Sequence, residues 1–239
     1  MTRNRHPSTP EQIEIVRWGA SLGAITAEAL ALRLDTTHAS ARARLSVVER
    51  RGLLLRDRPL TDQPALFSVT RAGLRACGAR GVEPCRVGPP TARHLSVCAL
   101  AAAALERCYG RDYRLMGERE LRRDERESGR SLLGARLGSL SGKGRQQHCP
   151  DLVLWPHVGD GLPVAVEMEL TVKGSRRLVE ICRAWARCRA VAGVIYIAPE
   201  DVARALGRAI DEARAWEQVV VLRPNALPGM EGLEDKGVL

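Results

Sequence analysis

Residues 162–172, LPVAVEMELTV, constrain the fold most strongly, because apolar and polar side chains alternate along them. Such alternation indicates a β-strand, in which successive side chains point to opposite faces of a sheet. One face would be wholly apolar and would carry Val164, Val166, Met168, Leu170 and Val172. The opposite face would carry Ala165, Glu167, Glu169 and Thr171, with Lys173 in phase if the strand continues. The sequence thus predicts two carboxylates and one ammonium group on a strand that is otherwise suited to burial.

A second apolar run, PDLVLW at 150–155, precedes this strand and is separated from it by turn-forming residues. If the two strands pair, Asp151 reaches the face that carries Glu167 and Glu169. Carboxylates that converge at a sheet edge suit Mg²⁺ or Mn²⁺. Such an ion polarises a phosphodiester and activates a bound water, and Lys173 would orient that water or stabilise the growing charge. We therefore predict catalytic roles for Asp151, Glu167, Glu169 and Lys173, with the three acids as metal ligands.

Two other interpretations of this cluster remain open at the level of sequence. An edge strand can carry charges on a solvated face, where Glu and Lys simply pair. His148 and Cys149, next to Asp151, suggest a transition-metal site, although a chance neighbourhood explains them as well.

The surrounding pattern predicts an α/β fold. Around the two strands we expect helices over 91–110, 117–130, 176–190 and 199–217, and further strands over 112–116, 193–198 and 218–224. This order predicts a mixed sheet flanked by helices.

The N-terminal third predicts short helices followed by two strands. The first helix starts at Pro10 and is interrupted by Gly19 and Gly23. Helices over 25–34 and 38–52 follow, the first capped by Thr26 and the second ended by Gly52. Strands are expected over 53–56 and 65–69, joined by a polar loop.

This order resembles the winged helix-turn-helix of MarR-like and PadR-like DNA-binding domains, and TRAGLRAC at 70–77 resembles the segment that ends such wings. A recognition helix lies in the major groove, while wing residues meet backbone phosphates. The resemblance implies DNA contacts from Thr36, Thr37, His38, Ser40, Arg42, Arg44, Arg56 and Arg58. Arg42 and Arg44 are two residues apart, so they should not share one helix face. A winged helix used only for dimerisation or protein contacts is the alternative.

Charge and cysteine usage narrow the class of protein. The net charge is +9, with 37 basic residues of which only three are lysines, so polyanions are expected partners. The composition of a high-GC genome would explain much of the arginine excess. The seven cysteines show no CxxC spacing, which predicts free thiols in a reducing cytoplasm. The N-terminus lacks an apolar leader, and the longest apolar run, 97–105, is too short to span a bilayer.

Pro150-Asp151, Glu167-x-Glu169 and the downstream Lys173 resemble the motif of the PD-(D/E)xK nuclease superfamily. More narrowly, a winged helix followed by HCPDLVL and VAVEMELTVKGSRRL resembles the replication-relaxation family of plasmid- and mobile-element-associated proteins. The resemblance implies a restriction-endonuclease-like αβββαβ domain. The superfamily lysine stands two residues after the second acid, whereas Lys173 is six residues after Glu167, or about 20 Å along an extended strand. Glu118 or Glu106 would supply the upstream acid found in many members.

The resulting prediction has a winged helix-turn-helix over 10–80, a linker over 81–92, a nuclease-like domain over 93–223 and a loose tail over 224–239. The expected function is DNA binding in plasmid or mobile-element replication or mobilisation, with DNA nicking or cleavage by Mg²⁺ or Mn²⁺ if the site is active. The alternative is a non-enzymatic winged-helix transcriptional regulator whose degenerate nuclease fold serves as a dimer or effector module. Double-stranded DNA and a second copy of the chain are the candidate partners; neither a membrane nor a small-molecule cofactor is expected.

Overall fold

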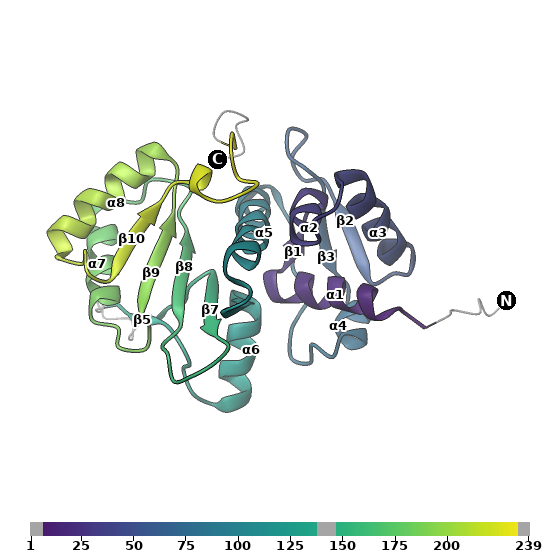
Figure 1. Ribbon diagram of the computed structural model, residues 1–239, viewed down its shortest axis with the longest axis horizontal. Helices are drawn as coiled ribbons and strands as arrows, with labels where there is room; N and C mark the ends of the chain where they lie inside the picture. The colour runs from purple at the N-terminus through teal and green to yellow at the C-terminus, as the bar shows by residue number, and fades with distance from the viewer. Residues whose placement is uncertain (1–6, 138–146, 234–239) are drawn as a thin grey trace.

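The computed structural model describes residues 7–137 and 147–233, and they form a mixed α/β protein. A three-stranded sheet and a five-stranded sheet lie on opposite sides of the long helix α5 (Pro89–Tyr109) (Figure 1). We call the elements before α5 the N-terminal unit, and α5 with everything after it the C-terminal unit. Among the described residues, none of the helices has the length and apolar character needed to cross a membrane.

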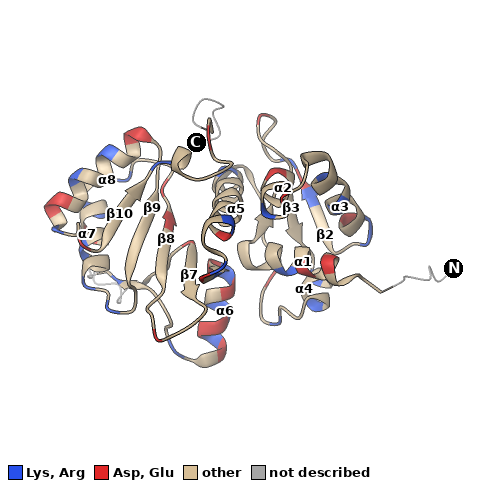
Figure 2. Cartoon of the chain, viewed as in Figure 1, with Lys and Arg blue, Asp and Glu red and all other residues tan. Residues whose placement is uncertain are grey.

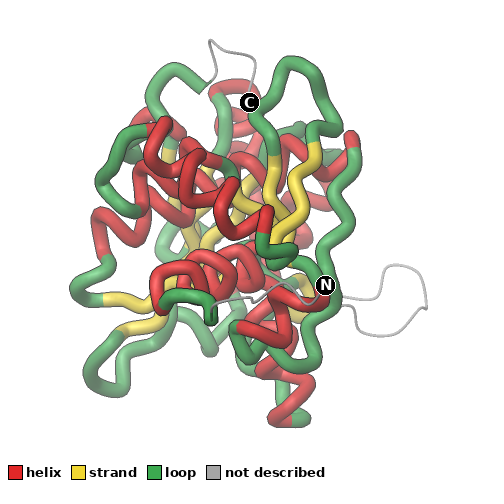
Figure 3. The backbone as a smooth tube through the Cα atoms, turned by 90° about the vertical axis from the view of Figure 1, so that its right-hand side faces the viewer, coloured by secondary structure: helices red, strands yellow, loops and turns green. Residues whose placement is uncertain are grey.

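The N-terminal unit packs four helices around the small antiparallel sheet, whose strand order is β1-β3-β2 (Figure 3). Its elements are α1 (Pro10–Leu22), β1 (Ala24–Ile25), α2 (Ala27–Arg33), α3 (His38–Arg50), β2 (Leu54–Asp57), β3 (Leu66–Val69) and α4 (Arg71–Ala76). Each helix starts after a threonine whose hydroxyl accepts a hydrogen bond from a backbone N–H three residues later. These caps are Thr9, Thr26, Thr37 and Thr70. The predicted helices and strands of this third are confirmed to within a few residues.

The first helix differs from its prediction at Gly19. The helix runs through Gly19 and ends only at Leu22, before Gly23 with φ +100°. A Cβ on Gly19 would lie 3.1 Å from the Val69 side chain, so the glycine permits α1 to pack closely on β3. Strand β1, which the sequence did not predict, pairs Ala24 and Ile25 with β3.

In the C-terminal unit the five-stranded sheet has the order β10-β9-β8-β7-β4. Strands β8, β9 and β10 are parallel, while β7 is antiparallel to both β8 and β4. The elements after α5 are β4 (Tyr113–Gly117), α6 (Glu118–Ser128), β5 (Ala135–Arg136), β6 (Gln147–His148), β7 (Leu152–Pro156), β8 (Val164–Met168), α7 (Ser175–Ala186), β9 (Gly193–Ile197), α8 (Glu200–Ala213), β10 (Val219–Leu222) and η1 (Pro224–Ala226). The predicted mixed sheet flanked by helices is confirmed.

Strand alternation divides the core between the two faces of the large sheet. Leu152, Val166 and Met168 face one way and join a hydrophobic cluster that includes α5 and the N-terminal unit. Val153 and Ala165 face the other way and pack with α7 and α8. The apolar core is therefore continuous from the small sheet through α5 to the large sheet.

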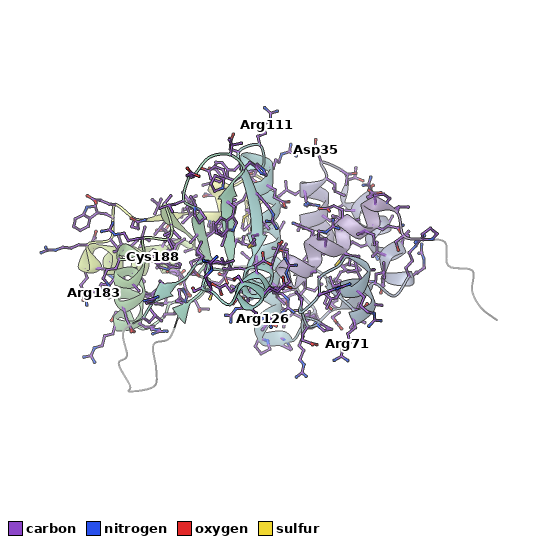
Figure 4. All side chains as sticks on the ribbon, turned by 90° about the horizontal axis from the view of Figure 1, so that it is seen from below. Asp35, Arg71, Arg111, Arg126, Arg183 and Cys188 are labelled. Atoms are coloured by element: carbon purple, nitrogen blue, oxygen red, sulfur yellow. The ribbon has the colours of Figure 1, made fainter. Side chains whose placement is uncertain are left out.

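Polar contacts also join the two units. The Ser21 hydroxyl accepts from the backbone N–H of Gly117 and donates to Glu120, both over 2.8 Å. Arg126 of α6 donates to the Gly81 carbonyl over 2.8 Å, on the underside of the molecule (Figure 4). Residues 89–92 of the predicted linker form the first turn of α5.

The predicted loose tail is wrong for its first ten residues. η1 lies there, and Leu227, Met230 and Leu233 are buried in the cluster that includes α5. These apolar side chains, spaced three apart, give the segment a core-facing side despite its glycines. Residues 234–239 lie outside the described part of the chain, as do 138–146 of the stretch between the charged helix and Asp151.

Candidate functional site

Acidic residues align across one end of the large sheet. In the observed registers Leu152 lies opposite Gly117 on β4 and opposite Val166 on β8. Extending both registers by one residue aligns Glu118, Asp151 and Glu167 across three neighbouring strands. The backbone N–H of Glu118 donates to the Asp151 carbonyl over 2.9 Å, which fixes the first pair. The pairing of β7 with β8 therefore aligns the backbones of Asp151 and Glu167, whereas the Asp151 carboxylate reaches His94 of α5. We call Glu118, Asp151 and Glu167 the carboxylate row; Figure 2 colours acidic residues red, and red segments are seen at β8 and along α6.

Asp151 comes just before β7, and both of its carboxylate oxygens have partners. Oδ2 accepts a hydrogen bond from the backbone N–H of Met168 over 2.7 Å. Oδ1 lies 3.1 Å from Nε2 of His94, which is on α5. The Asp151 carboxylate thus connects the start of β7, the end of β8 and α5.

Glu167 is buried on the α7 side of the sheet. Its Oε1 lies 2.9 Å from Nε2 of His148, an ion-pair distance, but this oxygen has no partner in hydrogen-bond geometry among the described residues. Burial raises the pKa of Glu167 to about 7, and the charge of nearby Asp151 adds to this effect. Burial alone would lower the pKa of His148, but the Glu167 carboxylate outweighs it and the pKa of His148 is raised. The pair is therefore suited to holding a proton near neutral pH.

Glu169 and Lys173 come together because β8 is shorter than predicted. The strand ends at Met168 rather than at Val172, although Glu169 N–H still donates to Ile197 of β9 over 3.1 Å. The chain then turns, and Lys173 Nζ forms an ion pair with Glu169 Oε2. The separation of about 20 Å between Glu167 and Lys173, expected for a fully extended strand, therefore does not apply.

Burial contradicts the interpretation of this strand as a solvated charged face. Glu167 is 6% exposed and Glu169 is 5% exposed. Of the two upstream acids, Glu118 lies in the carboxylate row, whereas Glu106 is bound to Arg33 Nε over 2.6 Å. Glu106 is therefore engaged by the N-terminal unit instead.

A second cluster beside Asp151 was not predicted. His94 and Cys98 lie one turn apart on α5, and Cys98 Sγ is 3.3 Å from His94 Nε2. The ligand atoms of His94, Cys98 and Asp151 all lie within 4.8 Å of one another. The hydrogen bond with Asp151 raises the pKa of His94. The sequence signal was the spacing of His94 and Cys98 four residues apart on a strongly predicted helix. The suggested ligand His148 lies at Glu167 instead.

Arginines gather on one side of the N-terminal unit. Arg42 of α3, Arg56 of β2 and Arg58 line one hollow together with His38. The guanidinium group of Arg56 lies 6.0 Å from the centre of the Phe67 ring. We call Arg42, Arg56 and Arg58 the arginine patch, and all three residues are exposed.

The remaining predicted DNA contacts have other neighbours. Arg44 forms an ion pair with Glu11 of α1, so Arg42 and Arg44 occupy different faces of α3, as their spacing predicts. His38 Nε2 lies 3.2 Å from Glu28. The Thr37 hydroxyl accepts from the Ser40 N–H as the cap of α3, and Thr36 is half-buried.

Comparisons with protein-family models, with curated proteins and with solved structures found no match.

Proposed function

We propose that this chain is a DNA-binding protein in which a winged helix-turn-helix precedes a nuclease-like domain. The order α2, turn, α3, β2, loop, β3 supports a winged helix in which α3 is the recognition helix. The arginine patch spans α3, β2 and the loop after it, so one duplex could contact all three arginines. The net charge of +9 agrees with a polyanionic partner.

The observation that carries a catalytic role is the buried Oε1 of Glu167. This oxygen makes no hydrogen bond of good geometry among the described residues, although His148 Nε2 lies 2.9 Å away, and its residue is aligned with Asp151 in the carboxylate row. A buried carboxylate oxygen with a second carboxylate nearby, that of Asp151, fits a hard divalent cation. Asp151 and Glu167 would hold Mg²⁺ or Mn²⁺, with Glu118 or Glu169 beside them. When bound, the ion would supply Lewis-acid activation of a phosphodiester and of a water.

Lys173 would take the place of the superfamily lysine from an unusual position. It comes after β8 rather than on it, and its ion pair with Glu169 holds it at the sheet end. Its positive charge opposes, without reversing, the rise in the pKa of Glu167 and of His148, as expected for a close neighbour. A half-exposed ammonium group there can reach a phosphate that approaches from solvent.

The biological setting that we propose is plasmid or mobile-element replication or mobilisation in the cytoplasm, and it rests on the motif resemblance alone. A homodimer on two DNA half-sites would be compatible with a winged-helix reader.

One observation favours a non-enzymatic regulator as a second candidate. Asp151 already has partners on both oxygens, and Glu169 is paired with Lys173. A magnesium-type cation at Asp151 would compete with His94 at Oδ1 or with the Met168 N–H at Oδ2. In that case the nuclease-like domain would serve as a dimerisation or effector module.

Cleavage of supercoiled plasmid in Mn²⁺ or Mg²⁺ separates the two candidates. Glu167→Gln keeps the shape of the side chain but removes the charge that a cation needs. The control is Glu212→Gln, because Glu212 is an exposed acid on α8. Nicking by the wild type and the control but not by Glu167→Gln supports the enzyme. Absence of nicking together with a gel shift that persists in EDTA supports the regulator.

A further inference from the structure

We propose that His94, Cys98 and Asp151 form a binding site for a thiophilic divalent ion of the zinc class. The site differs from the magnesium-type site above in its ligand chemistry, since it combines a thiol, an imidazole and one carboxylate oxygen. Zinc accepts sulfur, nitrogen and oxygen ligands together, whereas magnesium prefers oxygen. The inference requires neither DNA binding nor catalysis.

Helix geometry brings the first two ligands together. His94 and Cys98 are four residues apart within α5, so their side chains lie on the same helix face. Helix α5 packs against the face of the sheet that includes Leu152 and Met168. The third ligand, Asp151, comes immediately before Leu152, and its carboxylate reaches His94 of α5. Rigid elements rather than loops therefore hold two of the three ligands.

Two of the three separations are close to those of ligands around a tetrahedral ion, and the third is within 4.8 Å. Zn–N and Zn–O bonds of about 2.0–2.2 Å and Zn–S bonds of about 2.3 Å place neighbouring ligand atoms about 3.3–3.6 Å apart. His94 Nε2 lies 3.1 Å from Asp151 Oδ1 and 3.3 Å from Cys98 Sγ. An ion would therefore need only small side-chain movements to enter.

The same nitrogen of His94 faces both partners, and this argues against a nucleophile triad. In a Cys-His-Asp triad the thiol and the carboxylate bind opposite nitrogens of the imidazole, so that a proton passes through the ring. Here Nε2 is close to both Sγ and Oδ1. One nitrogen carries at most one hydrogen, so it cannot donate fully to both. A metal ion can satisfy all three ligand atoms at once, because they lie within 4.8 Å of one another.

Neighbouring groups orient the ligands, and solvent can supply the fourth position. Asp151 Oδ2 accepts the Met168 N–H, which leaves Oδ1 directed at His94. The His94 side chain is 42% exposed, so a water can complete the tetrahedron and an ion can enter from solvent. Coordination by Cys98 would release its thiol proton to solvent. Bound in this way, the ion would tie α5 to the start of β7.

Cobalt titration of the full-length protein, followed by absorbance, tests the site, because a Co²⁺–thiolate bond adds a ligand-to-metal charge-transfer band. We expect the band to saturate at one equivalent and to disappear when one equivalent of Zn²⁺ displaces the cobalt. Cys98→Ser should abolish it, and His94→Gln should weaken Co²⁺ binding by more than about tenfold. Cys108→Ser is the matched control, because Cys108 is an exposed cysteine on the same helix. Cys149→Ser tests the cysteine nearest Asp151 in sequence.

A band that survives in Cys98→Ser, or no band in the wild type, would overturn the proposal. If Cys98→Ser fails to fold by circular dichroism, X-ray absorption of the zinc-loaded wild type decides. One sulfur at about 2.3 Å from the zinc ion is then expected. A zinc coordination shell without sulfur overturns the site. Plasmid cleavage in Mg²⁺ is scored separately, so failure of the zinc site and failure of the proposed nuclease remain distinguishable. Because Asp151 belongs to both proposed ligand sets, the two ions would compete for it.

Discussion

His148 Nε2 lies 2.9 Å from Oε1 of Glu167, so a titratable pair from β6 and β8 lies beneath α7. The His148 ring also meets Trp185 of α7 edge-on, with 6.0 Å between the ring centres. Burial of the Glu167 carboxylate among apolar neighbours makes its charged form costly. The pair therefore links the protonation state of the candidate site to the stability of the fold.

The free energy of unfolding should fall as pH rises through this pair. The pKa of Glu167 is raised from 4.5 to about 7 by burial, and the pKa of His148 is also raised. Between pH 4.5 and about pH 7 the folded protein therefore binds more protons than the unfolded chain. The stabilisation is therefore fully present below pH 4.5 and is lost as pH rises through about 7.

Urea unfolding in EDTA at several pH values between about 5 and 8 checks this prediction, because that range covers the raised pKa. Glu167→Gln should flatten the dependence, and Glu212→Gln should leave it unchanged. If the free energy of unfolding changes equally with pH in the wild type and in Glu167→Gln, the role of the pair is contradicted.

DNA affinity should depend on the arginine patch and less on Arg44. Arg42→Ala and Arg56→Ala remove exposed cations, whereas Arg44 is already engaged by Glu11. Each lost phosphate contact should reduce the slope of log affinity against log salt by about 0.9. Fluorescence anisotropy with duplex DNA at several salt concentrations measures this slope. If Arg44→Ala lowers DNA affinity as much as Arg42→Ala does, the assignment of the Arg42 face of α3 as the DNA-contacting face is contradicted.

Removing the Lys173 ammonium group should destabilise the sheet end. Lys173→Met leaves the buried carboxylate of Glu169 without the ion pair that it forms with this lysine. An unpaired buried polar group costs about 1–3 kcal/mol, and the half-exposed lysine places the expectation at the lower end. The double variant Lys173→Met with Glu169→Gln should recover part of this loss. Chemical denaturation of the wild type, Lys173→Met and the double variant measures these free energies of unfolding. No recovery in the double variant would refute the pairing.

Gly73 should not tolerate a side chain. A Cβ there would lie 2.3 Å from the Leu53 carbonyl oxygen and 2.7 Å from the Val69 side chain. Gly73→Ala should therefore destabilise the protein by about 1–3 kcal/mol. Gly207→Ala is the control, because that helical glycine has open space and alanine favours the helix by up to about 1 kcal/mol. In thermal unfolding, the melting temperature should fall for Gly73→Ala and rise for Gly207→Ala.

Local sequence signals predicted most of the secondary structure. Thr26 caps α2 because its hydroxyl reaches the Ala29 N–H, a contact set by three residues of sequence. Strand alternation likewise placed the Glu167 side chain on the opposite face of the sheet from Val166 and Met168. The early end of β8 escaped prediction, because the residues after Met168 keep the same alternation although the chain turns away.

The sequence by itself determined which residue types share a helix face or a strand face, because those depend on spacing along the chain. His94 and Cys98 on one side of α5 are such a pair. Only the tertiary structure decided that Asp151 meets His94, 57 residues away, and that Glu118 lies in register with it. Those contacts depend on how α5 packs on the sheet and how β4, β7 and β8 pair, and long-range packing leaves no periodic signal in a single sequence.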